Sequence, residues 1–212
     1  MRMIKIAVAV AAVLGSSLAL AQQSESKWMM RVRAVDIQPV KQSDAIGALG
    51  LPADAVYVSN KVIPEVDFSY FFTKNIAAEL ILTYPQSMDV QVKNVGKVGN
   101  FKALPPTLSL QYHFSPDAAF SPYVGAGINY TLISKVSLPV VNSLTGANSS
   151  LDRSSLGGAL QVGFDYKLGQ NSYINFDIKK VYLSADLKVN GAKVSTVTLD
   201  PLLIGIGYGF KF

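Results

Sequence analysis

The sequence predicts an all-β fold, an eight-stranded antiparallel up-and-down transmembrane β-barrel. Three observations predict this fold class. Apolar residues recur at every second position in eight separate segments, which is the side-chain period of a strand. Short and long connections between these segments alternate along the chain. Aromatic residues gather toward one end of the predicted strands.

The first 21 residues differ from the rest and are typical of a secretory signal peptide. Arg2 and Lys5 supply a positive start, residues 6–14 are almost wholly apolar, and Ala19-Leu20-Ala21 forms a small-x-small cleavage site. The apolar run is too short to span a bilayer. We therefore expect residues 1–21 to be cleaved and residues 22–212 to form the barrel.

The eight alternating segments follow one another through the mature chain. They cover residues 28–35, 65–72, 76–84, 104–114, 122–132, 156–166, 174–178 and 202–212. The seventh segment changes parity near Lys179-Lys180, and the eighth could do so around Asp200-Pro201. A β-bulge at each place would account for such shifts, and proline is tolerated at bulges.

The connections predict how the barrel is placed in its membrane. Three are short turns, at residues 73–75, 115–119 and 169–172. Four are long loops, at residues 40–63, 89–103, 135–153 and 184–193, and their content of Gly, Asn, Ser and Pro predicts mobility. Outer-membrane barrels have short periplasmic turns and long extracellular loops. We expect the outer membrane of a Gram-negative bacterium, with both termini periplasmic and the long loops extracellular.

The alternation alone also fits a soluble exported barrel with an apolar interior. The aromatic residues favour the membrane, because a soluble core has no reason to gather them at one rim, whereas a bilayer interface attracts them. The residues expected at this interface are Trp28, Tyr70, Tyr112, Tyr166 and Tyr208.

Composition excludes several other classes of protein. Loss of Arg2 and Lys5 with the leader lowers the formal charge from +5 to +3, and no dense Lys/Arg cluster suggests a nucleic-acid partner. With no cysteine and one histidine, His113, the chain offers no disulfide framework and little basis for a metal site. We expect no metal and no cofactor.

Four stretches of the chain resemble one known family. LPPTLSLQYHFSPDAAFSPYVGAGINYT (residues 104–131), LDRSSLGGALQVGFDYKL (151–168), LDPLLIGIGYGFKF (199–212) and MRVRAVDIQP (30–39) together resemble the OmpW family, outer membrane protein W, over essentially the whole mature chain. This resemblance implies an eight-stranded outer-membrane barrel with a narrow hydrophobic channel for small apolar molecules, which leave sideways into the bilayer. The family commonly has Trp where this chain has Leu156 and Leu202, so different ligand contacts are expected.

The chain ends in an alternating strand that stops on an aromatic residue. Its Gly207, Phe210 and Phe212 resemble the signal by which the barrel-assembly machinery receives its outer-membrane clients. The last strand is therefore interpreted as both a wall of the barrel and an assembly signal.

The residues on the inward-facing side of the strands change in character with height. Toward the short turns they are charged and are expected to pair across the lumen as a plug, because unpaired buried charges are costly; this set is Arg31, Arg33, Asp67, Glu79, Asp165, Lys167 and Asp177. Toward the long loops they are apolar and are expected to form a channel or ligand pocket; this set is Val35, Ile37, Ile81, Pro105, Ile133 and Leu199, with Leu203 as the alternative to Leu199 if the last strand bulges. An eight-stranded barrel holds at most one small ligand.

We therefore predict a channel for small hydrophobic molecules with lateral release, acting as a monomer among outer-membrane lipids. Ordinary packing of a narrow lumen is the alternative interpretation of the apolar layer. A structural, adhesive or receptor barrel without transport is the alternative function. A lipid-modifying enzyme is a lesser one: His113 and Ser115 form an H-x-S pair, but Pro116 follows and the pair lies at a short turn.

Overall fold

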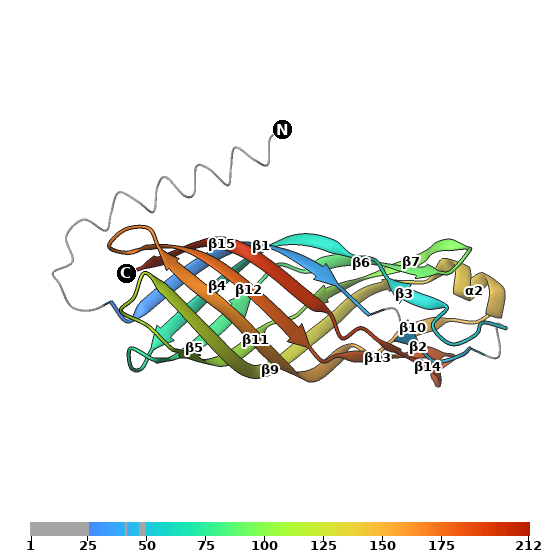
Figure 1. Cartoon of the computed structure of the whole chain (residues 1–212). Helices are drawn as coiled ribbons and strands as arrows, with labels where there is room; N and C mark the ends of the chain where they lie inside the picture. The colour runs from blue at the N-terminus through green and yellow to red at the C-terminus, as the bar shows by residue number, and fades with distance from the viewer. Residues whose placement is uncertain (1–25, 41, 47–49) are drawn as a thin grey trace.

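The computed structural model describes residues 26–40, 42–46 and 50–212. The predicted signal peptide, residues 1–21, lies outside the described residues. Figure 1 shows an elongated barrel of steeply tilted strands. The C-terminus and the short turns lie at one end, here called the terminal end, and the long connections gather at the other, here called the loop end.

Eight strands close the barrel. They are β1 (Trp28–Gln38), β4 (Lys61–Phe71), β5 (Ile76–Leu82), β8 (Thr107–His113), β9 (Phe120–Ser137), β11 (Ser154–Lys167), β12 (Ser172–Val181) and β15 (Leu202–Lys211). Each pairs antiparallel with the next along the chain, and β15 pairs with β1, as in Met30 opposite Phe210. The predicted fold class is confirmed, since the ring has no free edge.

The outer surface of this ring is apolar. Even-numbered side chains of the strands point outward, and large aliphatic ones are widely exposed, among them Ile128 at 61% and Leu160 at 52%. The predicted interface aromatics lie on this surface toward the terminal end, where the rings of Trp28 and Tyr70 are 4.9 Å apart. An apolar exterior of this extent matches a hydrocarbon environment. No helix in the described part of the chain is long and apolar enough to cross a membrane.

Strand β12 corrects one predicted irregularity. Its pairing with β11 and β15 is regular through Lys179-Lys180, so there is no bulge. Lys179 points inward like Asp177 before it, and Val181 follows on the same face. The sequence seemed to change phase only because the lumen itself changes from charged to apolar at this height. At Asp200-Pro201 the chain is indeed irregular: Asp200 has a φ of 27° between the two strands that flank it.

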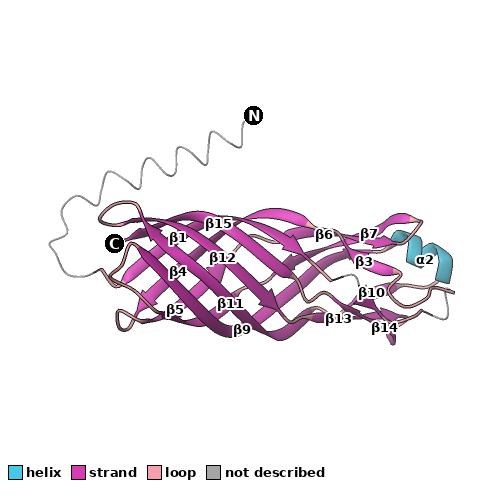
Figure 2. Cartoon of the chain, viewed as in Figure 1, coloured by secondary structure: helices cyan, strands magenta, loops and turns pink. Residues whose placement is uncertain are grey.

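The long connections, predicted as loops, contain strands and a short helix (Figure 2). Three of their strands, β3 (Val56–Val58), β6 (Gln86–Val92) and β7 (Gly96–Leu104), extend the wall beyond the outer part of β9. A separate small sheet contains β10 (Ser149–Leu151), β13 (Ser184–Val189), β14 (Ala192–Thr198) and β2 (Gln42–Ser43). The short helix α2 (Pro139–Thr145) lies at the same end.

One apolar core joins the barrel to this extension. It contains inward-facing residues of the barrel strands, such as Val35 and Ile133, together with Val58 and Val90 of the extension and Leu187 of the small sheet. The loop end is thus packed through the apolar upper lumen rather than lying loosely over it. This packing positions the cavities described next.

Candidate functional site

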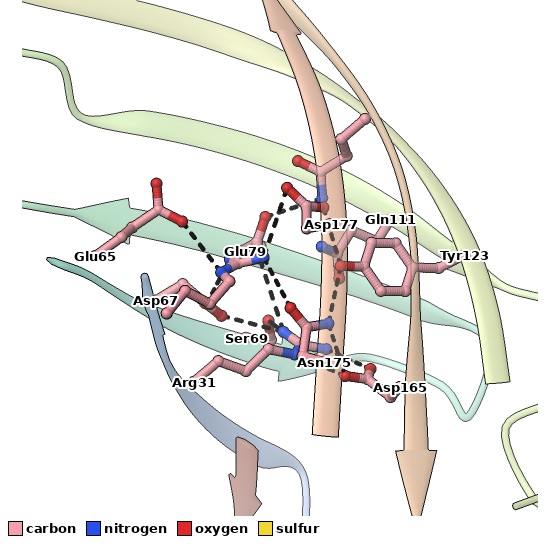
Figure 3. A network of polar contacts seen from close by, with 12 residues as sticks. Arg31, Glu65, Asp67, Ser69, Glu79, Gln111, Tyr123, Asp165, Asn175 and Asp177 are labelled. Carbon is pink, nitrogen blue, oxygen red and sulfur yellow. Dashed lines mark hydrogen bonds and ion pairs between the residues drawn. The ribbon is translucent and has the colours of Figure 1, made fainter. Parts of the chain in front are cut away.

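The middle of the lumen is filled by a network of buried charges (Figure 3). Arg31 of β1 is completely buried, and its Nε and Nη2 donate to the two carboxylate oxygens of Asp165 at 3.0 and 2.7 Å. Its Nη1 donates to Asp67 Oδ1 at 3.1 Å and to Ser69 Oγ at 2.8 Å. This bidentate, charge-assisted geometry is the strong form of an Arg–carboxylate contact.

Arg33, two residues along the same strand, binds the next layer of carboxylates. Its Nη2 donates to Asp67 Oδ2 at 2.5 Å and to Glu79 Oε1 at 2.7 Å. Its Nε lies 3.1 Å from Glu65 Oε1, and its Nη1 lies 3.6 Å from Asp177 Oδ1. Since residues two apart on a strand share a face, β1 alone supplies both guanidinium groups.

Side chains from the opposite wall complete the network. Tyr123 Oη donates to Asp177 Oδ2 at 3.0 Å, and Asn175 Nδ2 donates to Asp165 Oδ1 at 2.9 Å. Lys179 Nζ lies 3.5 Å from Asp177 Oδ1. The network therefore holds three cations, Arg31, Arg33 and Lys179, against five carboxyl groups. It crosses the lumen from β1 and β4 to β11 and β12.

Six of the seven residues predicted for a charged plug lie in this network, and the seventh does not. Lys167 is exposed at the rim of the terminal end, so its inclusion was wrong. It has the inward parity of Asp165 but lies beyond the level at which the lumen closes. The prediction also missed Glu65, Tyr123 and Lys179; their odd-numbered positions on β4, β9 and β12 were the available signal.

An apolar cavity of about 70 Å³ lies above the network, on the side of the loop end. Glu65 and Lys179 form part of its floor, and its walls are largely aliphatic. Five of the six residues predicted for an apolar channel line it: Ile37, Ile81, Pro105, Ile133 and Leu199. Val35 is buried in the adjoining core and does not line the cavity. Phe101 and Met88 line it as well and were not predicted, and Leu203, the alternative to Leu199 on the last strand, lines it too.

A second apolar cavity, of about 40 Å³, lies between the wall extension and the small sheet. It is lined by residues of the loop end such as Val58, Val90 and Leu187. Phe101 and Leu199 line both cavities, so these two side chains stand between them. The inner and outer cavities thus lie in sequence from the network toward the loop end.

The barrel wall beside the inner cavity has an interrupted ladder, here called the seam. Strand β4 continues to Lys61, but its pairing with β5 stops at Val66 opposite Leu82. Within the described chain, two side chains bridge the gap: Thr83 Oγ1 donates to the Pro64 carbonyl at 3.2 Å, and Lys61 Nζ donates to the Ser87 carbonyl at 2.7 Å. Proline suits such a stretch because it cannot donate to a ladder. Residues on both sides of the seam line the inner cavity, Ile63 on β4 and Thr83 on the facing segment among them.

The geometry gives no support to the H-x-S interpretation. His113 is buried, its Nε2 lies 3.2 Å from Gln111 Oε1, and its ring lies against Phe71 and Tyr123. Ser115 is exposed at the turn and is not among these contacts. Leu156, by contrast, is 72% exposed on the outer surface, and neither Leu156 nor Leu202 lines the inner or the outer cavity.

Comparison with known proteins agrees with this architecture. The model of the OmpW family matches residues 24–212. The uncharacterized outer-membrane protein y4mB of Sinorhizobium fredii is 42% identical over 193 residues, covering 88% of this chain and 80% of its own. Outer membrane protein W of Vibrio cholerae is 30% identical over 214 residues, covering 97% of each chain.

A solved structure extends the match to three dimensions. The crystal structure of the outer membrane protein OprG from Pseudomonas aeruginosa has a TM-score of 0.76 and 28% sequence identity, covering 90% of this chain and 97% of that one. The family comprises membrane barrels that are not enzymes, which confirms the prediction of a non-enzymatic protein. The closed eight-stranded ring, its apolar exterior and these matches together show that the chain belongs to the OmpW family of Gram-negative outer-membrane β-barrels.

Proposed function

We propose that this barrel is a channel for small hydrophobic molecules, which enter at the loop end and leave sideways into the bilayer. The observation that carries the proposal is the inner cavity: an aliphatic chamber with a charged floor and an interrupted wall. Burial of apolar surface favours entry of an apolar molecule at roughly 25 cal/mol per Å². The cavity size restricts the ligand to a small or slender molecule.

The two cavities suggest the inward route. A molecule that reaches the outer cavity is separated from the inner one by Phe101 and Leu199. Neither side chain carries a charge, and a rotamer change of a side chain takes only picoseconds to nanoseconds where packing allows it. We propose that these two residues gate passage between the chambers.

The charged network opposes any continuation toward the terminal end. To pass, a ligand would have to separate Arg31 and Arg33 from their carboxylates, and breaking a buried ion pair costs about 3–5 kcal/mol. An apolar molecule would form no ion pairs or hydrogen bonds that could compensate for this cost. The network therefore serves as a floor, and the same cost excludes a water-filled pore of the larger porin type.

The seam supplies the exit in this proposal. The seam lacks a backbone ladder and is bridged mainly by side chains of Thr83 and Lys61. Opening it breaks two such hydrogen bonds, which contribute about 0.5–1.5 kcal/mol each. The exposed aliphatic exterior on both sides would then receive the ligand directly.

The proposed orientation follows the usual arrangement of outer-membrane barrels. The terminal end would face the periplasm and the long connections the cell exterior. Cleavage after Ala21, recognition of Gly207, Phe210 and Phe212 by the assembly machinery, and a monomeric state belong to this proposal as predictions.

Uptake of a labelled small apolar compound tests the proposed function. Cells lacking the protein would be compared with cells carrying the parent, Ile81→Asp, Ile133→Asp or Val95→Asp. The first two place a carboxylate in the inner cavity, whereas Val95 is exposed in the turn between β6 and β7, so the third adds the same charge outside it. We expect faster uptake with the parent and Val95→Asp only. Equal uptake by all strains across a varied panel would favour the structural or adhesive function.

Crosslinking tests the exit. The β4–β5 register places Phe68 opposite Leu80, and the same register continued would place Pro64 opposite Tyr84 across the seam. The chain has no cysteine, so cysteine pairs at 64/84 and at 68/80 can be joined cleanly by a short thiol crosslinker. We expect the 64/84 crosslink to stop uptake and its reductive release to restore it, with the 68/80 crosslink as a neutral control. Undiminished uptake through a fully crosslinked 64/84 barrel would rule out lateral exit there.

A further inference from the structure

The largest cavity among those described lies at the opposite end of the molecule from the proposed channel. It is a cup of about 380 Å³ at the terminal end, several times the volume of the inner cavity. Apolar side chains of Met29, Phe71 and Ala77, with Tyr173 packed against them, form a buried cluster between this cup and the charged network. The cup is therefore a separate compartment, independent of the channel proposal.

The charges that line the cup are strongly unbalanced. Four lysines, Lys27, Lys74, Lys167 and Lys211, share it with one carboxylate, Asp117. Asp117 is 3.0 Å from Lys74 Nζ, which leaves three ammonium groups without a carboxylate partner of their own in the cup. Like charges that converge on one hollow repel each other, and an anion between them would remove that cost.

Lys211 is held in an unusual way for a half-buried lysine. Its Nζ lies 4.4 Å from the centre of the Phe71 ring and 5.5 Å from that of Tyr173. No carboxylate of the described residues lies within ion-pair distance of it. Cation–π contact positions an ammonium without consuming its hydrogen-bond donors. Lys211 is thus fixed at the floor of the cup with donors available to a ligand.

Ser26 supplies a second, independent indication of a missing partner. Ser26 lines the cup, and its hydroxyl is buried without a hydrogen-bond partner among the described residues. Buried polar atoms without partners are uncommon in folded proteins and each needs an explanation. A hydroxyl can donate to an anionic oxygen as readily as an ammonium can.

From this combination we propose that the cup binds a phosphate group. Lys211, Lys27 and Lys167 would neutralise its charge, and the Ser26 hydroxyl would donate to one of its oxygens. Lysine binds phosphate as a point charge without demanding one geometry, which suits a wide cup better than a bidentate site would. The phosphate could belong to a soluble anion or to the headgroup of a membrane lipid.

Calorimetric titration with inorganic pyrophosphate tests the site. The barrel would be held in phosphatidylcholine nanodiscs at low ionic strength, because such binding is screened by salt. We expect saturable binding of one pyrophosphate per barrel, weakened at least tenfold in a Lys27→Gln/Lys211→Gln double variant. The matched control is Lys93→Gln/Lys102→Gln, which removes two lysines at the loop end and should bind like the parent. Absence of saturable binding, or equal loss in both double variants, would overturn the proposal.

A second set of nanodiscs identifies the source of the phosphate. With phosphatidylglycerol present, a lipid-headgroup site predicts weaker pyrophosphate binding to the parent, because the lipid competes for the cup. A site for soluble anions predicts the same pyrophosphate affinity in both membranes after correction for the negative charge of the phosphatidylglycerol surface. The change in affinity of the loop-end control variant between the two membranes gives that correction. Either result supports a phosphate site provided that binding depends on Lys27 and Lys211.

Discussion

Replacement of Arg31 by methionine is the sharpest test of the charged network. Methionine keeps a long apolar stem but removes four hydrogen bonds, two to Asp165 and one each to Asp67 and Ser69. The two carboxylates are affected unequally. Asp67 keeps Arg33 Nη2 at 2.5 Å, whereas Asp165 has no other cation within ion-pair distance among the described residues and retains only neutral partners such as Asn175.

The expected magnitude follows from that asymmetry. Four hydrogen bonds to charged groups at about 1.5–3 kcal/mol each would give an implausibly large sum, because such contributions are not additive. The loss is better described as one buried carboxylate deprived of its partner, which costs about 3–5 kcal/mol. At an m-value of about 2 kcal/mol per molar, a loss of 4 kcal/mol moves the urea midpoint by about 2 M.

Trp28 provides the assay, since it is the only tryptophan in the chain and lies on the outer surface at the terminal end. Its emission would follow urea unfolding in lipid vesicles for the parent, Arg31→Met and Lys167→Met. Lys167 is exposed, so its replacement should change stability by less than about 0.5 kcal/mol. Adding Asp165→Asn to Arg31→Met should restore at least about 1.5 kcal/mol, because it removes the orphaned charge. Additive losses in that double variant, or equal midpoints for Arg31→Met and Lys167→Met, would refute the network's role.

Two further predictions concern the last strand and the loop end. Gly207→Ala should destabilise the barrel by about 1–3 kcal/mol, since a methyl group there would collide with Arg33 and the neighbouring backbone, whereas Gly205→Ala meets only ordinary contacts and should unfold like the parent; equal urea midpoints would contradict this. A hydrogen bond from Lys193 holds the pKa of Asp186 below its usual value. The ionised Asp186 carboxylate should therefore stabilise the small sheet fully above the ordinary carboxyl pKa. This stabilisation should be lost as pH falls through the lowered pKa of Asp186. A carboxyl NMR titration checks this, and in Lys193→Met the midpoint should rise.

The ring of eight strands could be predicted because its two faces lie in different environments. Lipid outside and a filled lumen inside impose a period of two along every strand, and this period is visible in single segments such as the one ending at Phe212. The same logic failed where the lumen is not uniform. Around Lys179 the inward face changes from charged to aliphatic, so a regular strand looked like a strand with a bulge.

Height along the barrel was also hidden from the sequence. Parity assigns Lys167 and Asp165 to the same face, but only the three-dimensional packing shows that Lys167 lies beyond the closure of the lumen. For the same reason, the basic cup was not predicted. Its lysines come from the N-terminal segment, the turn between β4 and β5, the end of β11 and the last strand, and no local pattern links them.

The ordered loop end, by contrast, could have been found. Asn190-Gly191 is the preferred sequence of a type I′ hairpin turn, and both residues have positive φ, 50° and 81°, between β13 and β14. Met88 and Val90 likewise alternate with polar residues in β6. Their glycine- and asparagine-rich surroundings indicated loops, and this composition masked the period of two.

Gly207 is predicted to take part in the assembly signal, but the packing of the barrel also requires a glycine at this position. Gly207 faces inward between the neighbouring strand and Arg33, where any larger residue would displace a member of the charged network. A defect of Gly207→Ala in cells would therefore not by itself indicate lost recognition by the assembly machinery. The two explanations separate in purified protein: a packing requirement predicts a lower urea midpoint for chemically refolded barrel, whereas a pure recognition signal predicts an unchanged one. Phe212→Ala removes a half-exposed outer side chain instead, so an assembly defect there with unchanged stability would point to recognition.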